Sequence, residues 1–107
     1  MTSIYSTLQE PTRNASVSVS TTSVTVADAR QFQDQPRKVI TIRNISAAAT
    51  SIISISLGNT TASANTGIVL RQYESFTDAA DGAYVPWQGT INAICADANG
   101  TLAIFER

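Results

Sequence analysis

Histidine is absent from the 107-residue chain, and cysteine occurs once, at Cys95. Without histidine the chain has no imidazole to act as a general base, to complete a Ser–His–Asp triad or to bind a metal. A single cysteine excludes an internal disulfide and a cysteine-based zinc site. Because Cys95 ends the apolar stretch Ile91–Cys95, we expect it to be a small core residue and not a reactive thiol. We therefore predict that the protein is not an enzyme and binds no cofactor.

Charged side chains are also scarce, at 14% of residues, and seven basic side chains nearly balance eight acidic ones. No basic stripe is present to neutralise phosphates, so we expect no nucleic-acid partner. No apolar run approaches the roughly 20 residues of a membrane span, and Met1–Glu10 lacks the features of a signal peptide. We expect synthesis in a cytoplasm and no membrane partner. A surface with so few charges resists self-association poorly, which favours a homo-oligomer, a dimer or a trimer.

Serine and threonine take the place of charges, and they alternate with apolar residues at a period of two, which is typical of strands. The candidate strands are Ala15–Ser20, Ser23–Ala27, Arg37–Ile45, Thr50–Gly58, Gly67–Leu70, Tyr73–Thr77, Ala83–Gly89, Thr90–Ala96 and Thr101–Glu106. In the strongest of them, Ile40, Ile42 and Asn44 share one face. Pro86 confines any strand around it to a sheet edge, and Asn99-Gly100 is a hairpin signal.

About eight short strands at spacings of roughly 8–12 residues, with no helix over two turns, predict an all-β fold. We expect a small antiparallel β-sandwich, jelly-roll-like, over residues 15–107. Residues 1–14 show no sustained period, and Pro11 interrupts them. We interpret them as an extended N-terminal arm whose Ile4, Tyr5 and Leu8 contact a partner. A frayed terminus is the alternative.

Carboxylates and aromatic side chains are the remaining candidates for a site. Asp78 and Asp81 straddle one predicted turn downstream of Glu74, where a Ca²⁺ site or an acid pair is conceivable. An ordinary turn explains every one of these residues without a site, so we predict no catalytic and no metal-binding residue.

Tyr73, Tyr84 and Trp87 lie near turns, where exposed rings can stack on sugars. The alternative is that they fill the core or a subunit contact, and we predict partner contacts for Tyr84 and Trp87. Arg37, Lys38 and Arg43 cluster on one strand, and we expect them to be a solvated strand start and edge.

Five stretches in the second part of the chain carry a resemblance to known proteins. They are Arg37–Asn44, Ile55–Gly58, Gly67–Leu70, Gly89–Ile94 and Thr101–Glu106. In order, they resemble the pattern R-K-x-apolar-x-I-x-N, apolar-S-L-G, G-I-x-L, G-x-I-x-A-I and T-L-x-I-x-E of small accessory proteins of tailed-bacteriophage virions. The resemblance covers about residues 37–106 with similar gaps. It implies a β-sandwich or jelly-roll unit displayed on a virion as a decoration, cementing or head-fibre component, and it carries no catalytic residue across.

The resemblance leads to a functional expectation with one alternative. We expect a virion structural protein that binds the capsid surface as an oligomer, with the major capsid protein or another virion protein as its partner. The alternative is a carbohydrate- or receptor-binding module of a phage tail or fibre, which would use the three aromatic residues to stack on a glycan.

Overall fold

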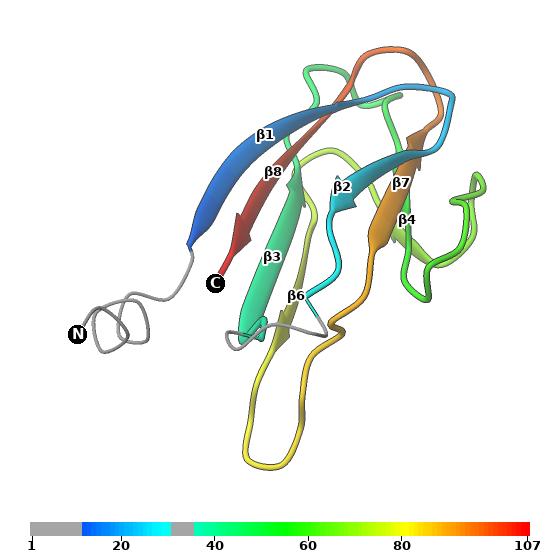
Figure 1. The fold of residues 1–107 in the computed structure, drawn as a ribbon. Helices are drawn as coiled ribbons and strands as arrows, with labels where there is room; N and C mark the ends of the chain where they lie inside the picture. The colour runs from blue at the N-terminus through cyan, green and yellow to red at the C-terminus, as the bar shows by residue number, and fades with distance from the viewer. Residues whose placement is uncertain (1–11, 31–35) are drawn as a thin grey trace.

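The computed structural model describes residues 12–30 and 36–107. Within these ranges it contains eight strands and no helix, arranged as two four-stranded sheets that face each other (Figure 1). The strands are β1 (Arg13–Val19), β2 (Val24–Ala27), β3 (Val39–Asn44), β4 (Ile53–Ser56), β5 (Ile68–Leu70), β6 (Ser75–Ala79), β7 (Ile91–Cys95) and β8 (Gly100–Glu106). The predicted all-β sandwich is confirmed. No helix long and apolar enough to cross a membrane occurs in the described ranges.

The strand order is that of a jelly roll. The first sheet has the order β1-β8-β3-β6 and the second has the order β2-β7-β4-β5, and all neighbours are antiparallel. The chain changes sheet at every connection except the one between β4 and β5. This is the arrangement of eight strands in two Greek keys. It places β1 and β6 at the edges of the first sheet and β8 and β3 at its centre.

The core lies between the two sheets and follows the period of the strands. Leu102 and Ile104 of β8 and Ile40 and Ile42 of β3 are at most 3% exposed. The second sheet contributes Ile53, Ile55, Ile91, Ala93 and Cys95, all at most 2% exposed. Burying one such aliphatic side chain contributes about 1.5–3 kcal/mol. Ile40, Ile42 and Asn44 share the buried face of β3, as the prediction of a common face requires, and the predicted core position of Cys95 is confirmed.

The boundary between the predicted arm and the first strand differs from the sequence prediction. β1 begins at Arg13, two residues before the predicted start at Ala15, because Arg13 and Asn14 continue the pairing with β8. Residues 1–11 of the predicted arm, which include Ile4, Tyr5 and Leu8, lie outside the described residues.

The segment Ala83–Gly89 forms no strand, and its one ladder contact is the bridge between Asp81 and Tyr84. Side chains bind the carbonyl groups of Pro86, Trp87 and Gly89 instead.

The turn at Asn99-Gly100 is not a hairpin, because β7 and β8 belong to different sheets. The chain passes over Cys95 there and then pairs with the end of β1. A Cβ atom on Gly100 would lie 2.6 Å from the carbonyl oxygen of Val19 and 2.7 Å from Sγ of Cys95. Glycine is therefore required at this position by close packing.

The outer faces of the two sheets differ. The connection between β4 and β5 crosses the outer face of the second sheet: the Asn65 amide donates to Ser54 Oγ (2.9 Å), and the Ala62 amide donates to Ser23 Oγ (3.0 Å). Ala62 is only 3% exposed. The outer face of the first sheet has no such cover among the described residues, and Asn14, Ser16 and Ser18 of β1 are exposed on it.

Candidate functional site

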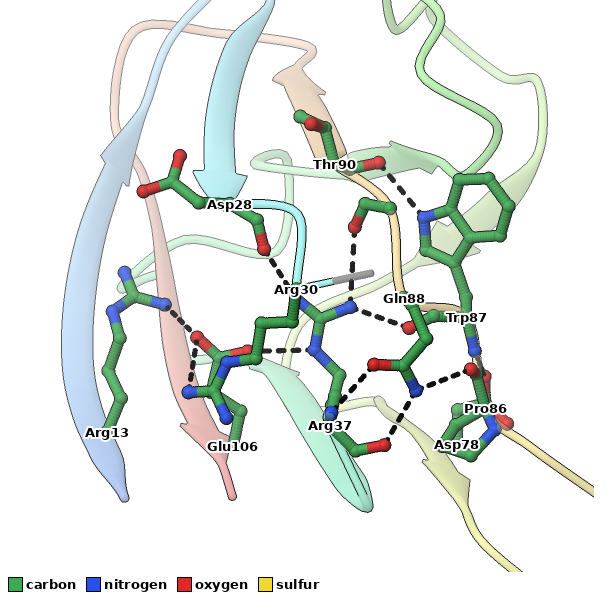
Figure 2. Close-up of polar contacts among 11 residues, drawn as sticks. Arg13, Asp28, Arg30, Arg37, Asp78, Pro86, Trp87, Gln88, Thr90 and Glu106 are labelled. Carbon is green, nitrogen blue, oxygen red and sulfur yellow. Dashed lines mark hydrogen bonds and ion pairs between the residues drawn. The ribbon is translucent and has the colours of Figure 1, made fainter. Parts of the chain in front are cut away.

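Arg37, two residues before β3, is a buried cation that joins three distant segments. The residue is 1% exposed. Nε donates to Glu106 Oε2 (2.8 Å), Nη1 to the carbonyl groups of Trp87 (2.6 Å) and Gly89 (3.3 Å), and Nη2 to the carbonyl of Asp28 (2.7 Å) (Figure 2). The prediction that Arg37 is a solvated residue at a strand start is wrong. Its guanidinium satisfies backbone groups that no strand ladder pairs.

The carboxylate of Glu106 forms ion pairs with three arginine side chains. Besides Arg37, it faces Arg13 of β1, whose Nη1 lies 3.1 Å from Oε1, and Arg30, whose Nη2 lies 3.7 Å from the same oxygen. Glu106 is 3% exposed, whereas the side chain of Arg13 is 37% exposed. A buried carboxylate is tolerated only when it is paired and hydrogen-bonded. The cluster therefore joins β1, β8 and the start of β3 at one end of the sandwich.

The side chain of Gln88 fastens the connection between β6 and β7, residues 80–90, to the backbone of Arg37. Its Oε1 accepts from the Arg37 amide (2.6 Å), and its Nε2 donates to the carbonyl groups of Arg37 (2.7 Å) and Pro86 (2.9 Å). The carbonyl of Gln88 accepts from the Arg30 amide (2.6 Å). Residues 80–90, which we call the braced loop, are thus fastened at Gln88 by hydrogen bonds to both Arg37 and Arg30.

A second set of contacts orders the outer part of the braced loop. Asp78 lies on β6, is 9% exposed and accepts hydrogen bonds from the Tyr84 hydroxyl and from the Trp87 amide (3.0 Å). The Trp87 ring packs against the core, and its Nε1 donates to the Thr90 carbonyl (3.1 Å). Tyr84 is 53% exposed and Val85 is 65% exposed. In Figure 1 the braced loop projects beyond the ends of the neighbouring strands.

The hydrogen bond to Asp78 raises the pKa of Tyr84, with smaller contributions from desolvation and from the negative charge of Asp78. The hydrogen bond to Asp78 favours the neutral phenol, so its contribution to the stability of the folded state is present at neutral pH. It is lost as the pH rises through the pKa of the folded protein's phenol. We expect Asp78→Asn to lower the pKa of Tyr84 towards the ordinary value, measured by NMR titration of its ring carbons. An unchanged Tyr84 titration in the variant would contradict the assignment.

The structure does not bring together Tyr73, Tyr84 and Trp87, the three aromatic residues that the sequence suggested for stacking on a sugar. Tyr73 precedes β6, whereas Tyr84 and Trp87 follow it, so the length of the strand separates them. Tyr73 is paired instead with Arg43, whose guanidinium lies 5.7 Å from the ring centre and donates through Nε to the Tyr73 carbonyl (3.2 Å). Arg43 and Lys38 are exposed, but the predicted edge position is wrong because β3 lies between β8 and β6.

The carboxylates that the sequence placed around one turn are engaged separately. Asp78 binds Tyr84 and Trp87, the backbone of Asp81 bridges to Tyr84, and Glu74 Oε1 accepts from the Arg71 amide (2.7 Å). In the part of the chain that the structure describes, no group of three or more acidic or cysteine side chains is placed to hold a metal ion.

Sequence reasoning missed Arg30, Gln88 and Glu106 as members of the site. One signal for Glu106 was present, because it continues the inward-facing series Gly100, Leu102 and Ile104 at a period of two. A carboxylate on an apolar strand face implies a buried cation. The pattern does not identify which of the arginines supplies it.

Comparison with known proteins adds no relative to this description. No protein-family model matches the chain, and no curated protein matches it.

Proposed function

We propose that the protein is a structural protein of a bacteriophage virion, which binds the capsid surface as an oligomer and cements or decorates it. The observation that carries the proposal is the braced loop, which is held in place by side chains and leaves Tyr84 53% and Val85 65% exposed. The resemblance of residues 37–106 to virion accessory proteins and the jelly-roll strand order support the same function. The proposed partner is the major capsid protein or another virion protein.

A braced loop suits this function for a physical reason. Ordering a free loop on binding costs roughly 0.5–1.5 kcal/mol for each flexible side chain that is immobilised. In this protein, Arg37, Gln88 and Asp78 already hold the loop, so the loop binds with little further ordering. Each copy contributes a small contact, and many copies on one shell together resist the internal pressure of packaged DNA. The predicted contacts of Ile4, Tyr5 and Leu8 form a second part of the proposal.

The test is occupancy on purified capsids of the phage that carries the gene. We expect Val85→Ser together with Tyr84→Ser to lower the affinity for capsids about tenfold, the effect of losing about 1.4 kcal/mol at a contact. Tyr73→Ser is the matched control, because Tyr73 is 58% exposed at the opposite end of β6. A variant that lacks residues 1–11 tests the arm while leaving β1 intact. Full occupancy by the loop variant, or absence of the protein from virions, would contradict the proposal.

The carbohydrate-binding alternative requires rings that gather on one surface. Trp87 packs against the core, and Tyr73 lies at the other end of β6 from Tyr84, so a platform of all three does not form. A glycan array with the wild type and Trp87→Ala separates the two functions, because glycan binding that is lost on substitution would favour the alternative.

A further inference from the structure

β1 is the longest edge strand in the described residues. It contains seven residues and pairs with β8 without a register shift from Arg13 opposite Glu106 to Val19 opposite Gly100. The other edges are shorter: β5 has three residues, β6 has five, and β2 has four and a register shift. A long, regular edge is a template for strand addition unless proline, a bulge or outward charges protect it. β1 has no proline, and its one charge, Arg13, is turned towards Glu106.

The hydrogen-bond pattern of the first sheet shows which backbone amide and carbonyl groups of β1 point away from β8, at the open edge of the sheet. Val39 and Arg107 exchange two backbone hydrogen bonds of 3.0 Å, and the Ile45 amide donates to the Thr101 carbonyl (3.0 Å). The odd-numbered residues of β8 therefore bond to β3, and its even-numbered residues bond to β1. By the register of β1 and β8, Asn14, Ser16 and Ser18 direct their amide and carbonyl groups away from the sheet. None of the residues 12–30 and 36–107 bonds to these groups.

We propose that β1 binds β1 of a second copy of this chain, antiparallel and around a two-fold axis at Ser16. Ser16 then lies opposite Ser16 of the other copy, and Asn14 lies opposite Ser18. Each of these pairs exchanges two hydrogen bonds, about six in all. The first sheets of both copies join into one continuous sheet.

The side chains of β1 are compatible with this register. Residues that face each other across the axis have the same parity, so inward-facing residues meet inward-facing ones. Arg13 lies opposite Val19 and not opposite the second Arg13, which avoids a like-charge pair. On the outer face of the sheet, the side chains of Asn14, Ser16 and Ser18 are small and uncharged. The inference rests on the proposed function in one respect: it specifies which contact forms the proposed oligomer. Of the dimer and the trimer expected from the sequence, this contact forms a dimer.

The first test is the oligomeric state of the purified full chain by analytical ultracentrifugation. We expect a dimer for the wild type and a monomer for Ser16→Pro. Proline removes the outward N–H of Ser16, and the ladder to β8 stays intact because it does not use that group. Ser16→Ala keeps the N–H and should remain a dimer, and circular dichroism confirms that each variant is folded. A monomeric or trimeric wild type, or a folded Ser16→Pro variant that stays dimeric, would overturn the inference.

The second test fixes the register and does not depend on the proline variant. Opposed residues of a hydrogen-bonded pair have Cα atoms about 5.5 Å apart, within the range that a disulfide spans. Under mild oxidation we expect Ser16→Cys to form a covalent dimer. Ser18→Cys is the matched control, because the two copies of residue 18 would lie about 14 Å apart. Cys95 is buried and does not interfere. Cross-linking at position 18 alone, or at neither position, would overturn the pairing at Ser16.

These outcomes are independent of the capsid experiment. A monomer that binds capsids overturns the inference and leaves the proposed function standing. A dimer paired through β1 that fails to bind capsids does the reverse.

Discussion

Replacing Glu106 with alanine should lower the free energy of unfolding by about 3–5 kcal/mol, the cost of leaving a buried charge without its partner. The guanidinium of Arg37 is almost fully buried and has Glu106 as its ion-pair partner among the described residues. The same substitution also leaves Arg13 and Arg30 near each other without the carboxylate between them. The measurement is equilibrium unfolding in urea, where the midpoint should fall and the slope should stay unchanged.

Arg13→Ala is the matched control for Glu106→Ala. It removes another ion pair of the same cluster, but the Arg13 side chain is 37% exposed and its attraction to Glu106 is screened by water. We expect a loss of at most about 1 kcal/mol. Equal losses for the two variants would show that burial does not set the strength of this cluster.

Asn44→Leu is expected to cost about 3 kcal/mol or more, although leucine has a similar size. Asn44 is fully buried on β3. Its Nδ2 donates to the carbonyl groups of Ser51 (2.8 Å) and Leu70 (3.0 Å), and its Oδ1 accepts from the Ser46 amide (3.0 Å). The substitution leaves three backbone groups without these bonds, and each unsatisfied buried group costs about 1–3 kcal/mol. Thermal unfolding followed by circular dichroism measures the effect.

Asn92→Ala provides the comparison for Asn44→Leu. The amide of Asn92 also binds two partners, the Thr60 carbonyl (2.7 Å) and the Thr25 hydroxyl (2.8 Å), but both hydrogen bonds are exposed. Water can replace them, so we expect a loss below about 1 kcal/mol. If the loss at Asn44 did not exceed the loss at Asn92, the buried amide would not be what holds β3 to the second sheet.

Much of the fold was predictable because strand periodicity is local. The alternation of Ile40, Ile42 and Asn44 correctly predicted that they share one face of β3, and the apolar residues before Cys95 correctly predicted a buried strand. Strand pairing was less accessible, because it depends on contacts between segments far apart in sequence. The turn at Asn99-Gly100 has the composition of a hairpin, yet close packing against Cys95 directs β8 into the other sheet.

The candidate site was predictable only in part, for the same reason. Tyr84 and Trp87 stand out as aromatic residues near a turn, and both belong to the braced loop. Arg37 was misassigned because its partner Glu106 lies 69 residues away along the chain. The amide of Gln88 gives no sequence signal of its role, since its ladder-like contacts with Arg37 arise only when β3 and the loop are already adjacent.

The central position of β8 in the first sheet has a consequence for synthesis of the protein. β1 has β8 as its neighbour in the sheet, and Arg13 meets a partner 93 residues later, at Glu106. A nascent chain therefore carries β1 with both edges open until residues 100–106 have left the ribosome. Pairings over such sequence separations form slowly and leave strands exposed to neighbouring chains in the meantime. Pairing of β8 with β1, which brings Glu106 opposite Arg13, ends this interval.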